Sequence, residues 1–327
     1  MQRKTFHRTL LALAAAALLP FAANAETTKL TLGHGAAPGN PRHEAAVLFA
    51  ERVKAKTNGR IEIQVAHSAQ LGDDAAMITA LRSGTLDMSA NSQGAIANVV
   101  PEYSAIGLPF LFSDVQKAWQ MLDGPVGEEL SKRTAAKGMV VLGYWDNGIR
   151  HITNSKKPIK APADLKGLKI RTPPDTMTVD IMQTLGADTQ QIKFAELYVA
   201  LQQGVVDGQE NPLANIASAK LYEVQKYLTL SGHKYETNPF VIGKRTWDRL
   251  TPADQKIFTE AAAEATQVQR KLSKEADEKL VAELKAKGVQ IETVDRKAFV
   301  EATKPVYNKW STGPIGEFVQ RVTQQAH

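Results

Sequence analysis

The apolar positions in the first third of the chain follow two spacings in turn. Leu30 and Leu32 repeat at period two and predict a strand. Apolar residues at helical spacing then follow Asn40 and Pro41, which suit the N-cap and the first turn of a helix. The same order of strand, helix and strand returns over residues 61–88. Strands that alternate with helices of this length form mostly parallel sheets with helices on both faces. The pattern therefore predicts an α/β fold.

The middle of the chain predicts a second α/β unit. The continuous apolar run Met139–Tyr144 predicts a strand buried on both faces, and the polar stretch Asp146–Lys157 follows it, where we place the first crossing between two domains. Beyond it, the spacing predicts strands at Leu168–Arg171 and Val205–Asp207 and helices at Thr176–Leu185, Phe194–Gln203 and Leu213–Tyr227. A strand at Phe240–Ile242 would carry the chain back to the first domain. Two crossings imply a hinge of two strands.

One long helix is predicted near the C-terminus. Thr251 and Asp254 form a capping-box type of start around Pro252, and apolar residues then recur as far as Leu284, before Gly288 ends the pattern. At 1.5 Å per residue this helix reaches ~50 Å, which is long enough to lie across two domains. A coiled-coil dimer is the alternative, but the apolar spacing is mostly four rather than a strict heptad. We therefore expect a monomer.

The composition excludes several classes of protein and of chemistry. The 327 residues are 43% hydrophobic and 23% charged, as is usual for globular proteins, and the length leaves room for about two domains. The chain contains no Cys, so a disulfide framework, a thiolate nucleophile and a Cys-ligated metal site are all excluded.

The N-terminus has the three parts of a secretory signal peptide. Three basic residues precede the apolar run 10–21, and small residues at Ala23 and Ala25 mark a cut before Glu26. The run is shorter than the ~20 apolar residues of a transmembrane anchor. Removing three of the 40 basic residues leaves 37 against 34 acidic ones, so the formal charge falls from +6 to +3. We expect a mature protein free in the periplasm, with no nucleic-acid partner.

Motifs of common enzymes do not occur in the sequence. Gly33 and Gly35 follow a predicted strand as in a dinucleotide fingerprint, but the third Gly is displaced and no acidic residue ends the second strand. His34, His43 and His67 lack the spacing that places two metal ligands on one helix face. No cofactor and no metal are therefore expected.

Two arginines stand where the predicted strands reach the interdomain cleft. Arg150 follows Asn147-Gly148-Ile149, and Arg171 ends the string Leu168-Lys169-Ile170. A guanidinium keeps its charge and donates two parallel hydrogen bonds to a carboxylate, so both arginines could face a bound anion. The alternative for each is an ion pair at the surface or between the domains.

Several sequence strings resemble the solute-binding proteins of tripartite ATP-independent periplasmic (TRAP) transporters. The matching strings are Ser68–Asp73, Leu108–Phe110, Thr153–Ser155, Leu168–Pro173, Phe194–Gln203 and Val206–Pro212. The resemblance covers nearly the whole mature chain in order. It implies a two-domain periplasmic-binding-protein-like fold with a cleft between the lobes. It also implies a role in delivering a small organic anion to the small and large membrane subunits of a permease.

With this fold, the chain divides into four parts. We expect residues 1–25 to be the signal peptide, residues 26–147 and 237–276 to form domain I, residues 148–236 to form domain II, and residues 277–327 to pack across both domains.

The resemblance also assigns roles to single residues. Arg171 corresponds to the arginine that pairs with the ligand carboxylate, and Asn211 to an amide that binds near it. Arg150 matches a second ligand-contacting arginine of the sialic-acid binders. Phe194 matches an aromatic residue that packs on the ligand, although helix core is an equal alternative for it. Trp145 and Asn147 are candidates by position only.

Two departures argue against sialic acid as the ligand. His34 stands where the sialic-acid members carry Asn, and Asn91 stands where they carry Glu. Both are also candidate ligand-binding residues, which brings the set to eight. Other strings resemble binders of uronates or other sugar acids, while C4-dicarboxylates and hydroxy or keto acids remain alternatives. A secreted α/β enzyme that acts on sugar acids, with Glu210 or Asp207 as its base, is the second interpretation. Paired arginines suit anion binding better than they suit a base of raised pKa.

Overall fold

The computed structural model describes residues 27–326, so the predicted signal peptide lies outside the described residues. Among the residues described, none of the helices is long and apolar enough to cross a membrane.

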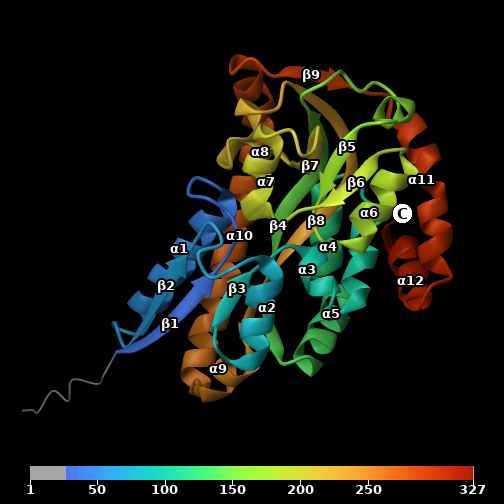
Figure 1. Cartoon of the computed structure of the whole chain (residues 1–327). Helices are drawn as coiled ribbons and strands as arrows, with labels where there is room; N and C mark the ends of the chain where they lie inside the picture. The colour runs from blue at the N-terminus through green and yellow to red at the C-terminus, as the bar shows by residue number, and fades with distance from the viewer. Residues whose placement is uncertain (1–26, 327) are drawn as a thin grey trace, which may run out of the picture.

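Nine strands in the described part of the chain form one continuous sheet (Figure 1). They are β1 (Thr28–Gly33), β2 (Ile61–Ala66), β3 (Met88–Ala90), β4 (Met139–Asn154), β5 (Lys169–Thr172), β6 (Asp188–Gln191), β7 (Gly208–Pro212), β8 (Tyr227–Gly243) and β9 (Gln290–Thr293). The order across the sheet is β2-β1-β3-β8-β4-β7-β5-β6, and β9 pairs with β8. Neighbours within each end, such as β1 with β2 and β5 with β6, are parallel, as the alternating pattern predicts.

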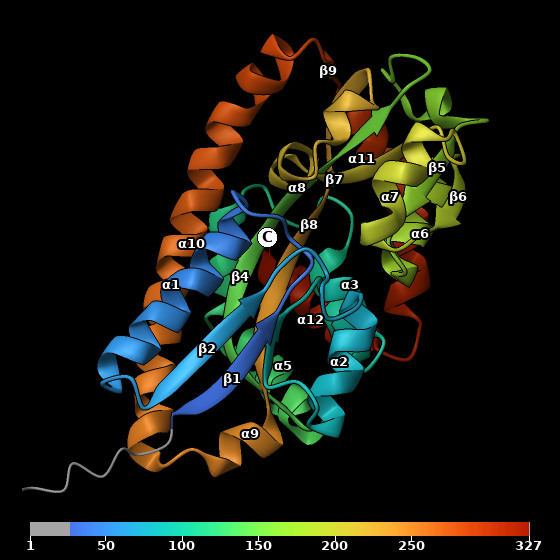
Figure 2. The ribbon, with the colours of Figure 1, turned by 60° about the vertical axis from the view of Figure 1, so that its left-hand side comes forward.

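Two long antiparallel strands, β4 and β8, join the two ends of the sheet and run through the middle of the molecule (Figure 2). We call the part around β1–β3 lobe I and the part around β5–β7 lobe II. The register of β4 on β8 shifts between Asp146 and Gly148, where Gly148 takes a φ of 115° that other residues rarely adopt. The two crossing strands that the sequence predicts are therefore present, and an irregularity in β4 lies between the lobes.

Helices cover both faces of the sheet. They are α1 (Pro41–Lys56), α2 (Asp74–Ser83), α3 (Gln93–Ala97), α4 (Val115–Leu122), α5 (Pro125–Ala136), α6 (Thr176–Thr184), α7 (Phe194–Gln202), α8 (Leu213–Ser218), α9 (Lys244–Arg249), α10 (Pro252–Ala286), α11 (Arg296–Ser311) and α12 (Gly316–Ala326). A 3-10 segment, η1, spans Pro101–Gly107. On one face of lobe I, Phe49 of α1 packs edge-on against Phe240 of β8 and Phe258 of α10, at centroid distances of 4.8 and 5.7 Å. This core fixes α1 and α10 to the sheet.

The long helix α10 contacts both lobes. Its N-cap Thr251 accepts a hydrogen bond from the amide of Asp254, as the capping signal predicts. The helix packs on α1 in lobe I and on α8 in lobe II (Figure 2). Its 35 residues correspond to ~50 Å, so the predicted length and position are confirmed. Beyond it, α11 packs on α6 and α12 packs on η1 and α4.

Three sequence predictions of secondary structure are wrong in extent or place. Val205–Asp207 precedes the strand and lies in a turn, while β7 covers the polar segment that follows. The helix predicted over Leu213–Tyr227 ends at Ser218, because Lys220 takes a left-handed conformation that breaks it. The strand predicted over Met139–Tyr144 is too short, since β4 continues through the polar stretch to Asn154 and its polar side chains find partners across the sheet.

Candidate functional site

A cleft lies between the two lobes, where the long strands β4 and β8 pass from one lobe to the other. Its empty volume is about 1040 Å³, including the part that opens to solvent. Lobe I supplies the loop before α1 and the N-terminal turns of α2 and α3. Lobe II supplies the ends of β5 and β7 and the start of α7, and the long strands β4 and β8 form the floor. The polar and aromatic lining residues are Arg42, Asp73, Asp74, Ser92, Asn98, Asn147, Arg150, Arg171, Lys193, Phe194, Asn211, Asn215 and Glu236. Five of the eight residues that the sequence proposed line this cleft together.

Arg171 extends into the cleft from β5 without an ion-pair partner among the described residues. Its Nε donates to the backbone oxygen of Ile192 at 2.7 Å, which fixes the guanidinium, and no carboxylate in residues 27–326 lies within 4.0 Å of it. The residue is only 2% exposed. Burial lowers the pKa of Arg171 to about 10, because the nearest carboxylates offset only part of the lost hydration. The remaining N–H groups of this guanidinium are free to bind an anion.

Phe194 stands beside Arg171 at the start of α7. The Arg171 Cζ lies 6.0 Å from the ring centroid, within the range of a cation–π contact. The ring both lines the cleft and packs at the edge of the lobe II core. The two interpretations of this residue, ligand contact and helix core, are therefore compatible.

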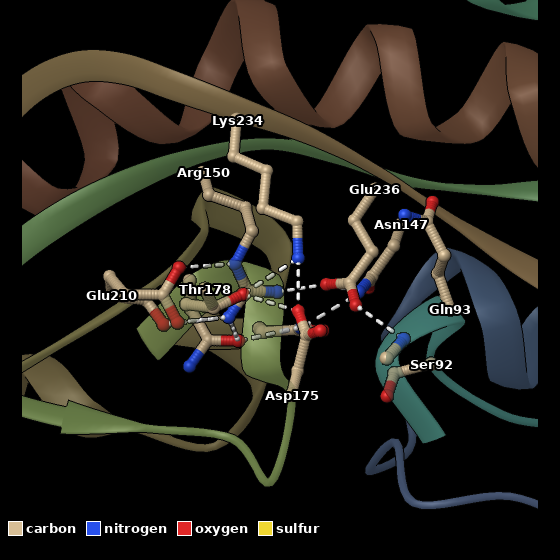
Figure 3. A network of polar contacts seen from close by, with 12 residues as sticks. Ser92, Gln93, Asn147, Arg150, Asp175, Thr178, Glu210, Lys234 and Glu236 are labelled. Carbon is tan, nitrogen blue, oxygen red and sulfur yellow. Dashed lines mark hydrogen bonds and ion pairs between the residues drawn. The ribbon is translucent and has the colours of Figure 1, made fainter. Parts of the chain in front are cut away.

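Arg150 is held by two carboxylates on neighbouring strands (Figure 3). Its Nε and Nη2 donate to both oxygens of Glu210, and its Nη1 donates to Glu236. Burial alone would lower the pKa of Arg150, but the charges of Glu210 and Glu236 raise it above the usual range. Arg150 is therefore saturated by the protein, whereas Arg171 is not.

The carboxylate of Glu210 is strongly acidic in this setting. Burial would raise the pKa of Glu210, but the charge and hydrogen bonds of Arg150, with a further contact to His233, lower it to about 2. Glu210 therefore stays ionised at physiological pH, and it acts as a fixed counter-ion for Arg150 rather than as a proton acceptor.

Four asparagines connect the lobes across the floor of the cleft. Asn215 of α8 donates to Asn211 at 3.1 Å and to Asn147 at 3.2 Å. The Asn215 side-chain oxygen accepts from Asn40, the N-cap of α1, at 3.0 Å. Asn147 also donates to Glu236 at 2.9 Å. These amides bring Asn211 and Asn147 to one surface and order the polar floor.

The lobes also contact each other away from the floor. Lys193 of lobe II pairs with Asp73 of lobe I at 2.6 Å, and both line the cleft. Gly94 of α3 lies so close to Asp175, the N-cap of α6, that a Cβ there would come within 2.4 Å of the Asp175 Cβ. Asp175 is itself held by buried Lys234 and Thr178 (Figure 3). The structure is therefore a closed arrangement of the two lobes.

Three residues that the sequence proposed do not line the cleft. Trp145 is fully buried, its ring stacks on Phe240, and its N–H donates to Thr266 at 3.1 Å, so it belongs to the lobe I core. His34 lies beneath the cleft wall, where its Nδ1 accepts from the Ala36 amide and burial lowers its pKa to about 3. Trp145 lies on the part of β4 before the register shift between Asp146 and Gly148, which packs in the lobe I core, and His34 follows the end of β1.

Asn91, like His34, is buried behind the residues that line the cleft. It donates to Ser89 at 3.0 Å and to the backbone of Asp74 at 3.3 Å. His34 and Asn91 thus support cleft residues and do not form the surface themselves.

Sequence reasoning missed Arg42, Asp74 and Glu236, which all line the cleft. The signal was available for two of them, because Arg42 and Asp74 each stand in the first turn of a helix that follows a parallel strand. Ligands of α/β proteins gather at that edge. Glu236 gave no such signal, because it lies in the polar part of β8, before the apolar run Phe240–Ile242 that the sequence predicts as a strand. Among the described residues, no group of three or more His, Asp or Glu is arranged to hold a metal ion.

Comparisons with known proteins agree with this geometry. Residues 32–312 match the model of the bacterial extracellular solute-binding proteins of family 7. The uncharacterized protein y4mM of Sinorhizobium fredii is 58% identical over 280 residues, which are 85% of this chain but 52% of that longer protein.

Two solved structures share the fold along nearly their whole length. A TRAP periplasmic solute-binding protein from Polaromonas, bound to D-erythronate, is 37% identical at a TM-score of 0.88 and covers 90% of this chain and 98% of its own. The sugar-acid-binding protein DctPAm from Advenella mimigardefordensis, in complex with galactonate, is 34% identical at a TM-score of 0.90. The match covers 92% of this chain and 98% of that protein. The chain belongs to family 7 of the bacterial extracellular solute-binding proteins, which serve TRAP transporters.

Proposed function

We propose that this protein is the periplasmic component of a TRAP transporter and binds a sugar acid of the aldonate or uronate type. The observation that carries the proposal is Arg171, a buried guanidinium in a closed cleft with no carboxylate of the described chain paired to it. Leaving a buried charge unpaired costs several kcal/mol, and an anionic ligand removes that cost. The ligand carboxylate binds Arg171 and packs beside Phe194.

The remaining lining favours a ligand with many hydroxyls. Asparagines at 147, 211 and 215 both donate and accept, while Asp74 and Glu236 only accept. A hydroxyl can satisfy all of these groups, whereas a methyl or methylene group cannot. The erythronate and galactonate complexes of the two solved relatives support the same class of ligand.

Ligand binding stabilises the closed state because the cleft walls come from different lobes. A ligand between Arg171 in lobe II and polar groups in lobe I interacts more strongly with the closed form than with an open one. The irregular pairing near Gly148 gives β4 a place to bend. The closed form, as a monomer, then delivers the acid to the permease subunits in the membrane.

The alternative of an enzyme is weaker. Glu210, one of the two candidate bases, has a pKa near 2 because Arg150 holds it. Asp207, the other candidate, binds the Lys169 amide at 2.9 Å and is not among the residues that line the cleft. We propose a binding protein without catalytic turnover, and incubation with sugar acids should leave them unchanged.

A thermal-shift screen tests the proposed function. The mature protein is heated with erythronate, galactonate, gulonate, galacturonate or glucuronate, with galactose as an uncharged control and succinate as a dicarboxylate. A ligand at 100 times its Kd adds about 2.7 kcal/mol to the free energy of unfolding. We expect at least one sugar acid to raise the midpoint by several degrees and galactose to have no effect. No shift with any of the five acids would reject the proposal.

A further inference from the structure

Arg42 is a second buried guanidinium that faces the cleft, and it comes from the opposite lobe to Arg171. It stands in the first turn of α1 in lobe I and is 5% exposed. Its Nη2 donates to the side chain of Asn147 at 2.9 Å, and its Nη1 makes a long contact of 3.5 Å to the Ala90 oxygen. Among residues 27–326, no carboxylate forms an ion pair with it, and its buried Nε has no partner.

The environment of Arg42 does not compensate for its charge. Burial lowers the pKa of Arg42, and Asp74 and Glu236 oppose this only from beyond ion-pair distance. A neutral side chain of similar length would fill the same space at lower cost, since unpaired buried charges are unfavourable. Within the described part of the chain, the cleft therefore contains two guanidiniums without a carboxylate partner, one in each lobe.

The charge balance of the cleft indicates what Arg42 binds. Four positive side chains and three carboxylates line the described cleft, and Glu210 adds a fourth carboxylate behind Arg150. The positive residues are Arg42, Arg150, Arg171 and Lys193, and the lining carboxylates are Asp73, Asp74 and Glu236. The closed site is thus neutral before the ligand enters. One carboxylate makes it singly negative, and a dianion would leave two uncompensated charges in a buried space.

A hydroxyl fits beside Arg42 better than a second carboxylate does. Arg42 can only donate, and Asp74 and Glu236 in the same cleft can only accept. A hydroxyl oxygen accepts from a guanidinium while its proton goes to a carboxylate, so a single hydroxyl can satisfy both kinds of group.

We propose that Arg42 is the ligand anchor of lobe I and a specificity-determining residue that binds hydroxyls of the ligand remote from its carboxylate. The proposal rests on the function proposed above and narrows it to polyhydroxylated monocarboxylates that span the cleft from Arg171 to Arg42. Arg42 in lobe I and Arg171 in lobe II then make the ligand itself the bridge that holds the lobes together.

Calorimetric titration tests Arg42 with the tightest binder among erythronate, galactonate, gulonate, galacturonate and glucuronate. Arg42→Met removes the charge and keeps much of the volume. Arg52→Met is the matched control, because Arg52 lies on the same helix but pairs with Glu264 at the surface. Loss of a charged hydrogen bond should weaken binding tenfold to a hundredfold in Arg42→Met and leave Arg52→Met unchanged. Equal affinity of Arg42→Met and wild type would overturn the inference.

A crystal structure of the wild type with the same acid separates a ligand contact from a merely structural role. We expect the carboxylate on Arg171 and a hydroxyl oxygen within hydrogen-bond distance of the Arg42 guanidinium. A carboxylate on Arg42, or a ligand that leaves Arg42 uncontacted, would overturn the inference even if Arg42→Met binds poorly. If none of the five acids binds the wild type, the proposed function itself fails, and Arg42 loses its role with it.

Discussion

Arg150 and Arg171 both stand in the cleft, are equally buried and come from neighbouring parts of the sheet, yet their surroundings differ. Arg150 is enclosed by Glu210 and Glu236, and the pKa of its guanidinium is raised. Arg171 has one hydrogen bond to a backbone oxygen and an aromatic ring beside it, and its pKa is lowered to about 10. The difference separates an arginine that maintains the structure from one that offers its charge to a ligand.

This comparison shows that residue type and location alone do not define a binding residue. An arginine that already has two carboxylates gains little from a third anion, because its charge is compensated in the protein. An arginine without a partner gains the full benefit of an ion pair in a largely dry site. The two residues should therefore respond to mutation in opposite ways, one in binding and the other in stability.

The largest expected effect is on binding, in Arg171→Ala. Removing this guanidinium leaves the ligand carboxylate buried without a partner, at a cost of about 3 to 5 kcal/mol, or roughly two to three and a half decades in Kd. Arg171→Lys should not restore full affinity, because an ammonium lacks the planar fork. Calorimetric titration measures both, and Arg150→Ala should weaken binding less. If Arg171→Ala binds within threefold of wild type, Arg171 is not the carboxylate anchor.

The next effect is on stability, in Arg150→Met. The substitution leaves Glu210 and Glu236 buried without their cation, so the free energy of unfolding should fall by about 3 to 5 kcal/mol. Arg171→Met is the matched control, since the ligand-free protein loses an unpaired charge together with one hydrogen bond to the Ile192 oxygen, and it should lose much less stability than Arg150→Met. Denaturant unfolding without ligand measures both. Equal destabilisation of the two variants would remove the distinction between the arginines.

The pH dependence of stability sharpens the same point. Glu210 has a pKa near 2 in the folded protein, below that of an unfolded glutamate, so its contribution is complete above about pH 5 and is lost as the pH falls towards 2. That contribution is on the order of 3 kcal/mol. In Glu210→Gln the loss of stability over this range should be smaller than in wild type. Identical pH profiles would show that Arg150 and Glu210 are not coupled as the structure implies.

The smallest effect is expected at the rim of the cleft. Lys193 and Asp73 join the lobes, but the Lys193 side chain is 55% exposed, and such pairs contribute about 1 kcal/mol or less. Lys193→Ala should therefore weaken ligand binding less than tenfold, and high salt should reduce the difference from wild type. Lys54→Ala, which removes another exposed ion pair far from the cleft, is the control. A loss as large as that of Arg171→Ala would mean that the rim, not the floor, holds the ligand.

Local signals in the sequence predicted much of the fold. The capped starts of α1 and α10, at Asn40 and Thr251, and the parallel strands of lobe I were readable because each depends on neighbours in the chain. The extent of β4 and β8 was not readable. Their polar residues, such as Asn147 and Glu236, are stabilised by partners about 90 residues away, which no local pattern records.

As with the fold, the sequence predicted only part of the candidate site. The strings around Arg171, Asn211 and Phe194 placed them in one cleft, as the structure does. Trp145 was misplaced because it lies just before the register shift in β4, on the part of the strand that packs in the lobe I core, and no local pattern records that shift. Whether an arginine is paired or free, as for Arg150 and Arg171, depends on groups from other strands, which no local sequence pattern records.

Titration of two protein variants with two ligands tests most directly whether Arg171 binds the ligand carboxylate. Wild type and Arg171→Met are each titrated with the tightest-binding sugar acid and with its primary amide, which keeps the shape and removes the charge. We expect wild type to bind the acid at least a hundredfold more tightly than the amide, and Arg171→Met to bind the two about equally. If Arg171→Met keeps the full preference for the acid, another group binds the carboxylate, and the contrast between Arg150 and Arg171 does not explain ligand binding.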